Sequence, residues 1–377
     1  MERTDFDKNF EAIFENEMEK MKSKIKKPNL LLIGGTGVGK SSLINRIFGE
    51  EVAAVGAGDP VTKGLVKIDC DNPPIVFFDA EGYEILKDDS LNGTNFDTKI
   101  KPEIERRCKS ANMHDHIHLV WYCISITNNR VTEYDIQNIK YFLAQKMNVA
   151  IVFTKCDNDT KDFRTSNTFQ SLIQDKVGAE LAFFKTCNDK RFNFDIETLV
   201  EWSAKALSDE QLRRSFITAQ LASIDLKKKE AYKLVGAESL GAAAAGGFNP
   251  FPISDAVILT PLQIAMCVQI ANIFWMGTGS FLDFGQLLKT QLVSMAGKAA
   301  VLSLTKIIPG FGQVINAAVA GSLTFGLGAA VTEGNYAALK QFLKTGKKPD
   351  WTMIFTSGSF TTAVSNAVSN WKAKNGK

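Results

Sequence analysis

The sequence predicts an α/β domain with a doubly wound, mainly parallel sheet, followed by a second, all-α and strongly apolar domain. Two observations support this fold class. Apolar strand-like runs alternate with helical stretches up to about residue 207, and charged side chains become rare between Leu234 and Phe342. The 377 residues are enough for two domains.

The first 27 residues predict an amphipathic helix. Phe6, Phe10, Phe14 and Met18 recur at helical spacing among charged residues, and Pro28 ends the pattern. We expect a docking helix packed on one of the domains, with a partner-binding or membrane helix as the alternative. The charged start carries no apolar signal segment.

The next 180 or so residues, taken here as a domain over 28–207, alternate between strands and helices. Continuous Val-, Ile- and Phe-rich runs are typical of strands buried on both faces. Strands are expected at 29–35, 65–69, 75–79, 118–126, 149–154 and 180–186, and helices near 40–49, 101–113, 131–147, 165–178 and 195–207.

A glycine-rich loop lies between the first strand and the first helix of this domain. It fits the pattern G-x-x-x-x-G-K-[ST], in which backbone N–H groups and a helix N-terminus bind phosphates. Lys40 is expected to reach the β- and γ-phosphates, and Ser41 to offer its hydroxyl to Mg²⁺. The predicted phosphate-binding residues are Gly34, Gly35, Thr36, Gly37, Val38, Gly39, Lys40, Ser41 and Ser42.

The end of the strand at 149–154 carries a candidate base-reading motif, Thr154-Lys155-Cys156-Asp157. The Asp157 carboxylate can accept hydrogen bonds from guanine N1–H and from its 2-amino group. Adenine lacks this pair of donors and would leave the carboxylate unpaired, which is costly. The sequence resembles the GTPase superfamily here, and the resemblance implies guanine contacts from Thr154, Lys155 and Asp157.

Two further segments match motifs of the same superfamily. Asp79-Ala80-Glu81-Gly82 resembles its DxxG motif, and Thr62 lies where the superfamily has a switch threonine. The resemblance implies that Thr62 and Asp79 help Ser41 hold Mg²⁺, and that Gly82 donates its N–H to the γ-phosphate. Lys40, Thr62 and Gly82 are then the residues that act on the reacting phosphate.

The motif order over about 28–205 resembles the Era- and TrmE-like branch of P-loop GTPases. It implies GTP or GDP with Mg²⁺ as ligands. Tyr83 occupies the position where Ras-like relatives have a water-orienting glutamine, so we expect slow hydrolysis, low in the range of roughly 10⁻⁴ to 10⁻² per second. The fifth motif is doubtful, because only Thr186-Cys187-Asn188 stands in its place.

Composition restricts the partners and the compartment. The net charge of +3 gives no case for nucleic acid, and the six cysteines lack metal-binding spacing and indicate free thiols in a reducing compartment. His114, His116 and His118 alternate and could share a strand face; we interpret them as the polar entrance to a buried strand rather than a metal site. The expected location is cytoplasmic, with peripheral or integral attachment at the inner face of the cytoplasmic membrane as an alternative.

A charged helix is expected over 208–233, joining the two domains. Its Lys227-Lys228-Lys229 cluster is interpreted as a solvated face, or as a contact for anionic lipid headgroups.

The C-terminal domain, 234–377, contains charge-free runs at 256–282 and 307–332, both longer than the roughly 20 residues of a spanning helix. Glutamines and an asparagine in the first run, and frequent Gly and Ala in the second, favour closely packed helices instead. The segments NPFPISDAVILTPLQIAM and IPGFGQVINAAVAGSLTFGLG resemble an uncharacterised, often membrane-associated helical domain that follows Era-like GTPase domains in bacterial proteins.

The leading hypothesis is a GTP-dependent switch whose C-terminal helices contact a membrane surface, a membrane protein or a second copy of the chain. The alternatives are a membrane-acting GTPase, similar to dynamin-like or immunity-related GTPases, and a GTP-binding scaffold with little turnover. No nucleic acid is expected.

Overall fold

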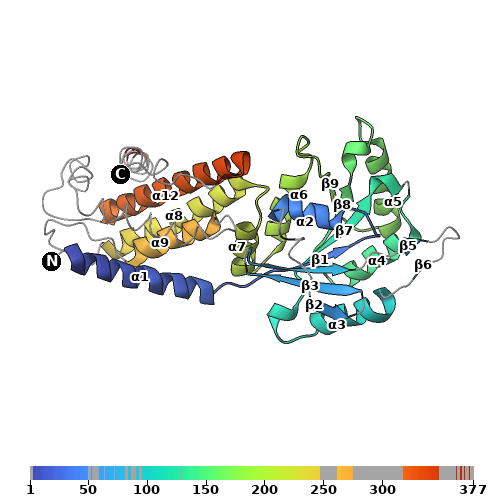
Figure 1. Ribbon diagram of the computed structural model, residues 1–377, viewed down its shortest axis with the longest axis horizontal. Helices are drawn as coiled ribbons and strands as arrows, with labels where there is room; N and C mark the ends of the chain where they lie inside the picture. The colour runs from blue at the N-terminus through green and yellow to red at the C-terminus, as the bar shows by residue number, and fades with distance from the viewer. Residues whose placement is uncertain are drawn as a thin grey trace. The chain divides into compact units, whose positions relative to one another are not determined.

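The computed structural model divides the chain into two compact units (Figure 1). One unit comprises residues 25–223, and the other comprises residues 1–24 together with 224–377. The residues described are 3–49, 52, 59–62, 64–71, 73–80, 84–85, 91–92, 96–128, 130–246, 261–274, 317–347, and the single positions 362, 366, 369 and 373.

The first unit is built on a seven-stranded sheet with the order β2-β3-β4-β1-β7-β8-β9. β1, β4, β7, β8 and β9 are parallel, whereas β3 is antiparallel to both β2 and β4. A separate two-stranded sheet pairs β5 with β6. The strands are β1 (Asn29–Ile33), β2 (Asp59–Thr62), β3 (Leu65–Cys70), β4 (Ile75–Ala80), β5 (Glu84–Ile85), β6 (Leu91–Asn92), β7 (Leu119–Ser125), β8 (Val149–Thr154) and β9 (Ala182–Lys185).

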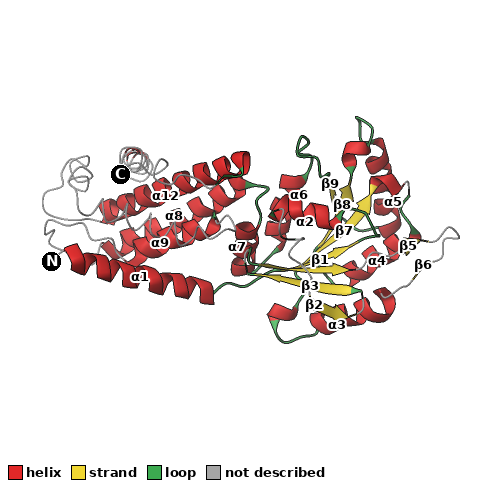
Figure 2. Cartoon of the chain, viewed as in Figure 1, coloured by secondary structure: helices red, strands yellow, loops and turns green. Residues whose placement is uncertain are grey.

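Helices cover both faces of this sheet, which confirms the predicted doubly wound, mainly parallel fold (Figure 2). On one face, apolar side chains of the strands pack against Ile104, Ile139 and Ile173 from three different helices. On the other face, Phe48 contacts the rings of Phe77 and Trp121. The helices are α2 (Lys40–Phe48), α3 (Lys101–Cys108), α4 (Glu133–Ala144), α5 (Arg164–Val177), α6 (Ile196–Ala206) and α7 (Glu210–Ala219), with a π-helix at Phe96–Ile100 and 3₁₀ turns at Met113–Asp115, Ile126–Asn128 and Cys156–Asn158.

The antiparallel strand β2 was not among the predicted strands. Its sequence, DPVT, is short and contains a proline, so it lacks the apolar run that identified the buried strands. A register shift between Pro60 and Thr62 further separates it from a regular strand. It lies at the edge of the sheet, where proline is tolerated because one side of the strand makes no ladder hydrogen bonds.

The single connecting helix expected over 208–233 is wrong, because the chain forms two helices there. α7 begins after Asp209, whose carboxylate accepts from the N–H groups of Gln211 and Leu212. It ends at Gln220, whose buried side chain bonds to the backbone of Ser223. α8 then starts at Ile224, which is also the first residue of the longer segment of the second unit. The turn between α7 and α8 is stabilised by the Gln220 side chain. Glutamine is also common in helices, so the sequence pattern does not reveal where α7 ends.

The described part of the second unit consists of helices, in agreement with the predicted all-α class. α8 packs against both α9 and α12, and α1 packs against α9. At Gly328 in α12 a Cβ atom would lie 2.7 Å from Val235 in α8, so the two helices approach as closely as glycine allows. The helices are α1 (Arg3–Ser23), α8 (Ile224–Gly246), α9 (Pro261–Ile273) and α12 (Ala317–Thr345).

An amide of the first charge-free run has a structural role in this helical unit. The Gln263 side chain in α9 donates to the Thr324 hydroxyl in α12 at 3.1 Å. The runs 256–282 and 307–332 fall only partly within the described residues, and within that part of the chain no helix is long and apolar enough to span a membrane.

The lysine cluster at the start of α8 is not a solvated face. The Lys227 side chain is fully buried, and its amine donates to the carbonyl of Ile273 at the end of α9, at 2.8 Å. Lys228 pairs with Glu333 of α12 at 2.8 Å, and only Lys229 of the three lysines is exposed.

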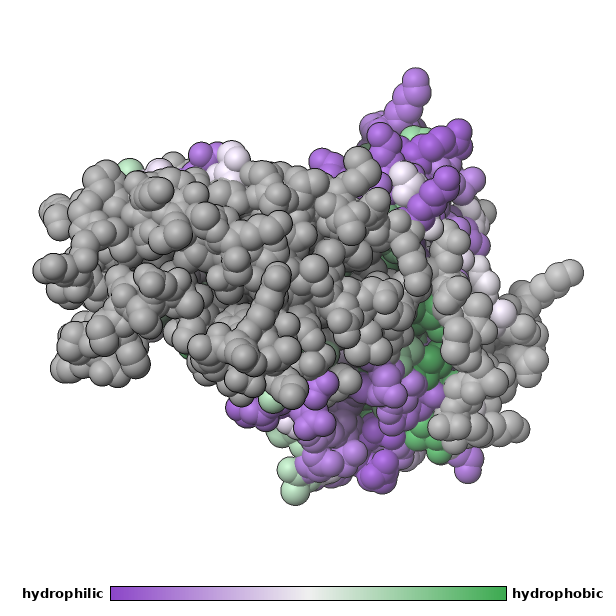
Figure 3. Space-filling model, turned by 60° about the vertical axis from the view of Figure 1, so that its left-hand side comes forward, coloured by the Kyte–Doolittle hydropathy of each residue, from purple (hydrophilic) through white to green (hydrophobic). Residues whose placement is uncertain are grey.

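On the face drawn in Figure 3, the described surface is mainly hydrophilic, with hydrophobic side chains in smaller areas.

Candidate nucleotide-binding site

The glycine loop between β1 and α2 has the backbone that its motif requires. Gly37 and Gly39 have φ angles of 71° and 106°, in the region that favours glycine, and Gly39 caps the start of α2. At Gly34 (φ 150°) a Cβ atom would lie 2.3 Å from the carbonyl oxygen of Cys123 in β7. Side chains are therefore excluded from the loop where it passes the sheet.

Lys40, the first residue of α2, is folded back onto this loop. Its side chain is 8% exposed, and its amine donates to the carbonyls of Gly34 at 3.1 Å and Gly35 at 3.4 Å. Ser41 and Ser42 follow it at the exposed start of the helix. The Lys40 amine and the hydroxyl of the exposed Ser41 therefore lie together at a helix N-terminus, an arrangement suited to phosphate groups. The remaining loop residues are the exposed Thr36 and the buried Val38.

Asp79, near the end of β4, points a carboxylate oxygen into a buried position. Its Oδ1 has no hydrogen-bond partner among the described residues. Burial raises the pKa of Asp79, and the positive charge of Lys40 partly opposes this shift. A buried and unpaired carboxylate oxygen is costly unless a cation or donor joins it. Asp79 therefore fits the metal-holding role that its motif implies.

Thr62 is at the end of β2, away from the glycine loop in sequence. It pairs with Leu65, which in turn pairs with Ala80. Neighbouring strands lie about 5 Å apart, so the backbone of Thr62 lies about 10 Å from the end of β4, which carries Asp79. Gly82 and Tyr83 lie outside the described residues.

The base motif is tied to the glycine loop by two side chains. The Thr154 hydroxyl donates to the Val38 carbonyl at 2.5 Å, and the Lys155 amine donates to the Gly37 carbonyl at 2.8 Å. Asp157 follows in a 3₁₀ turn and is exposed. The structure therefore joins the phosphate loop and the base motif, with Thr154 and Lys155 as the links and Asp157 available to a base.

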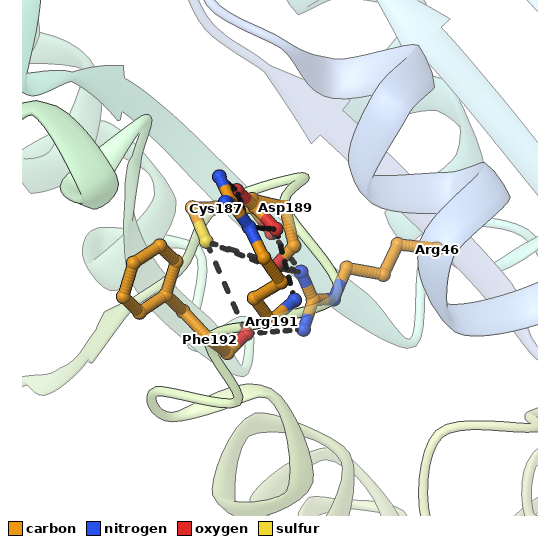
Figure 4. A network of polar contacts seen from close by, with 5 residues as sticks. All are labelled: Arg46, Cys187, Asp189, Arg191 and Phe192. Atoms are coloured by element: carbon orange, nitrogen blue, oxygen red, sulfur yellow. Dashed lines mark hydrogen bonds and ion pairs between the residues drawn. The ribbon is translucent and has the colours of Figure 1, made fainter.

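Arg46 also contacts the loops of this site, and it was not among the residues predicted from the sequence. It reaches from the last turn of α2 to the loop after β9, where its guanidinium donates to the carbonyls of Cys187 and Asp189 at 2.8 and 2.7 Å (Figure 4). No pattern marks such a contact in advance, because the acceptors are backbone groups 141 and 143 residues away.

The three histidines do not form a shared strand face. His114 is exposed in a 3₁₀ turn, and His116 contacts the Ser110 carbonyl. Nδ1 of His118 accepts from the backbone N–H of Asn29 at 2.8 Å, and burial lowers the pKa of His118 to about 4. Within the described part of the chain, no cluster of histidine, cysteine and acidic residues could hold a metal ion.

Comparisons with known proteins agree with the geometry of this unit. Residues 29–155 match the family described as 50S ribosome-binding GTPase. Septin-8-B of Xenopus laevis is 29% identical over 149 residues, which cover 35% of this chain and 35% of that septin. The probable GTP-binding protein EngB of Streptococcus uberis is 26% identical over 153 residues, covering 41% of this chain and 72% of that protein.

The chain therefore spans about a third of the length of the septin it matches. The solved structure of a probable GTP-binding protein engB aligns with 47% of this chain at 16% identity and a TM-score of 0.33, too low to add support. Sheet order, glycine loop and family match together define the first unit as a P-loop GTPase domain. Within that class, the matched region extends from β1 to Lys155 of the base motif.

Proposed function

We propose that the protein binds GTP and GDP together with Mg²⁺, hydrolyses GTP slowly, and uses its nucleotide state to control the helical unit. The observation that supports nucleotide and metal binding most directly is the unpaired Oδ1 of Asp79 near the Lys40 amine. A cation between phosphate and this carboxylate would relieve an otherwise costly burial.

Each site residue takes a role that its position allows. Lys40 exchanges its loop carbonyls for phosphate oxygens, and the N–H groups of residues 34–42 surround the phosphates. Ser41, Thr62 and Asp79 hold the metal ion, which neutralises phosphate charge when bound. Asp157 reads guanine, and the DxxG motif alone, without a described position, assigns the N–H of Gly82 to the γ-phosphate.

Slow turnover is proposed from the residue that follows the DxxG motif. Tyr83 offers a phenol where a carboxamide would orient the attacking water. The motif order also supports placement in the Era- and TrmE-like branch, with a C-terminal domain of the bacterial type.

The switch proposal rests on a contact at the far end of α2. The backbone N–H of Leu221 donates to the Ile47 carbonyl at 2.7 Å, and the rings of Phe48 and Phe216 are 5.9 Å apart. α2 begins at the phosphate loop, and the helical unit begins at Ile224, three residues after Leu221. A nucleotide-dependent shift of α2 would thus move Leu221 and, through the next residues of the chain, the first turn of α8.

Replacing Leu221 with proline tests this route, because proline removes the N–H that α2 accepts. Gln220 has φ −79° and ψ 149°, which is the conformation that the residue before a proline prefers. We expect L221P to bind nucleotide normally but to lose the difference in hydrogen exchange of α8 between the GDP and GTP-analogue states. If that difference persists in L221P, the route through α2 is wrong; if the wild type binds neither nucleotide, the whole proposal fails.

The partner of the helical unit is better supported as a protein than as a lipid surface. Of the three lysines that would meet lipid headgroups, Lys227 and Lys228 are engaged within the unit, and only Lys229 is exposed. We propose a cytoplasmic protein that meets a protein partner, a second copy included. Flotation with anionic liposomes in the GDP and GTP-analogue states tests this, and nucleotide-dependent flotation would instead favour the membrane-acting alternative.

A further inference from the structure

One arginine organises the whole loop after β9. Arg46 Nη1 contacts the carbonyl oxygens of Cys187 and Asp189, and Nη2 contacts that of Phe192 at 2.5 Å. Figure 4 shows the guanidinium at the centre of this loop. The planar fork of an arginine can serve several acceptors in fixed directions, which a lysine ammonium cannot reproduce.

The same arrangement leaves N–H donors free at the start of the loop. The carbonyls of residues 187, 189 and 192 turn toward Arg46. The backbone N–H groups of Cys187 and Asn188 have no acceptor within the described part of the chain. Two adjacent N–H groups without acceptors form a site for an electronegative ligand atom.

These donors lie beside the base motif. The N–H of Cys156 donates to the Thr186 carbonyl at 3.0 Å, and the N–H of Thr186 donates to the Phe153 carbonyl at 2.7 Å. The negative charge of Asp157 also helps to raise the pKa of Cys187, after the larger effect of burial. The loop that Arg46 holds therefore begins next to the carboxylate that reads guanine.

We propose that Arg46 is a positioning residue for base recognition. It holds the loop so that the N–H groups of Cys187 and Asn188 donate to the 6-oxo group of guanine while Asp157 accepts from N1–H and the 2-amino group. Adenine presents a 6-amino donor to these N–H groups and is rejected. This inference rests on the proposed binding of guanine nucleotides.

The test compares three nucleotides that differ at single positions of the base. Relative to GDP, 6-thio-GDP replaces the 6-oxygen with a weaker acceptor, and IDP lacks only the 2-amino group. Loss of a hydrogen bond corresponds to about a tenfold change in affinity. We expect the wild type to bind GDP about tenfold better than either analogue. In R46M, GDP binding should weaken about tenfold and the preference over 6-thio-GDP should disappear, whereas the preference over IDP should remain.

A purely structural role for Arg46 would lower the affinity for all three nucleotides by the same factor. R46K should lie between wild type and R46M, and it replaces R46M if that variant fails to fold. R106M is the matched control, because Arg106 is an exposed arginine paired with Glu103 on α3. Unchanged preference over 6-thio-GDP in both Arg46 variants overturns the inference. Failure of the wild type to bind GDP at all refutes instead the proposed function.

Discussion

Among the described residues, each unit buries one lysine against backbone carbonyls, and the two lysines differ in what surrounds them. Lys40 meets the carbonyls of Gly34 and Gly35 in a glycine-rich loop, and its positive charge partly opposes the raised pKa of Asp79. Lys227 meets the carbonyl of Ile273 at the end of a helix, and its side chain is completely excluded from solvent.

In the proposed function this difference separates a ligand-binding lysine, Lys40, from a structural one, Lys227. In the proposed function the Lys40 amine leaves its carbonyls for a phosphate, and four of the six residues from 34 to 39 are glycines, which leave space beside it. The Lys227 amine stabilises the C-terminus of α9, where unpaired carbonyls and the helix dipole favour a donor. Burial lowers the pKa of Lys227 to about 7, so about half of its amine groups are neutral at pH 7.

The largest expected effect follows from removing the amine of Lys40. We expect K40M to weaken GTP binding by about a thousandfold or more, equivalent to about 4 kcal/mol, because a buried charge contact to phosphate is lost. The unfolding free energy should change little, since methionine fills the same space. Titration with a fluorescent, non-hydrolysable GTP analogue measures the affinity.

K227M is the matched control for this comparison. It should keep the affinity of the wild type for nucleotide, since Lys227 belongs to the helical unit. If K40M binds nucleotide normally, the Lys40 assignment is wrong; if K227M loses binding to the same extent, the two lysines do not have separate tasks.

The second prediction concerns stability at alkaline pH. The pKa of Lys227 is about 7 in the folded protein and about 10.5 in the unfolded chain. Between these values the unfolded chain binds more protons, so the contribution of this residue to stability increases as the pH rises. The unfolding free energy of wild type minus that of K227M should rise by about 3 kcal/mol from pH 7 to 9.5. Urea unfolding followed by circular dichroism measures it, and a flat difference would show that Lys227 is solvated.

The two lysines also show what sequence can and cannot predict. Lys40 was assigned because its neighbours form a local motif, and such a motif can be recognised from the sequence without knowing the fold. The strands β1, β4, β7 and β8 were predicted for a similar reason. A strand that is buried on both faces has a continuous apolar run in its sequence.

Features that depend on distant partners were not predicted. Lys227 stands in a run of three lysines, which ordinarily indicates solvent, and its partner Ile273 is 46 residues away. Arg46 contacts backbone carbonyls that every sequence provides, so no residue type signals the contact. β2 is stabilised by its pairing with β3 rather than by its own composition.

The third prediction tests a buried neutral base in the GTPase unit. Nδ1 of His118 accepts from Asn29, and its Nε2 is 3.2 Å from the Met113 carbonyl, so the ring is neutral with its proton on Nε2. The folded pKa of about 4 lies below the ordinary 6.5, so stability is lost as the pH falls from 6.5 to 4.

For this group we expect a loss of about 2 kcal/mol across that window, less than the full shift because the side chain is not completely buried. H118N retains an acceptor for Asn29 and should lack the loss. Urea unfolding at pH 4.5 and 6.5 checks it. An identical acid sensitivity in H118N would assign the effect to other groups.

The smallest effect concerns two glycines and returns to the contrast between a loop and a helix bundle. In α12, a Cβ on Gly328 would lie 2.7 Å from Val235 and 3.0 Å from Met266, which belong to the two neighbouring helices. Overpacking of this kind costs about 1–3 kcal/mol, and the higher helix propensity of alanine returns at most about 1 kcal/mol. G328A should therefore destabilise the helical unit by about 1 kcal/mol.

G241A in α8 is the matched control. A Cβ atom on Gly241 would have nothing within 4 Å, so the alanine should stabilise the unit through helix propensity alone. Opposite signs in urea unfolding would show that close helix approach, rather than backbone freedom, requires Gly328; equal signs would mean that α12 and α8 can move apart without cost.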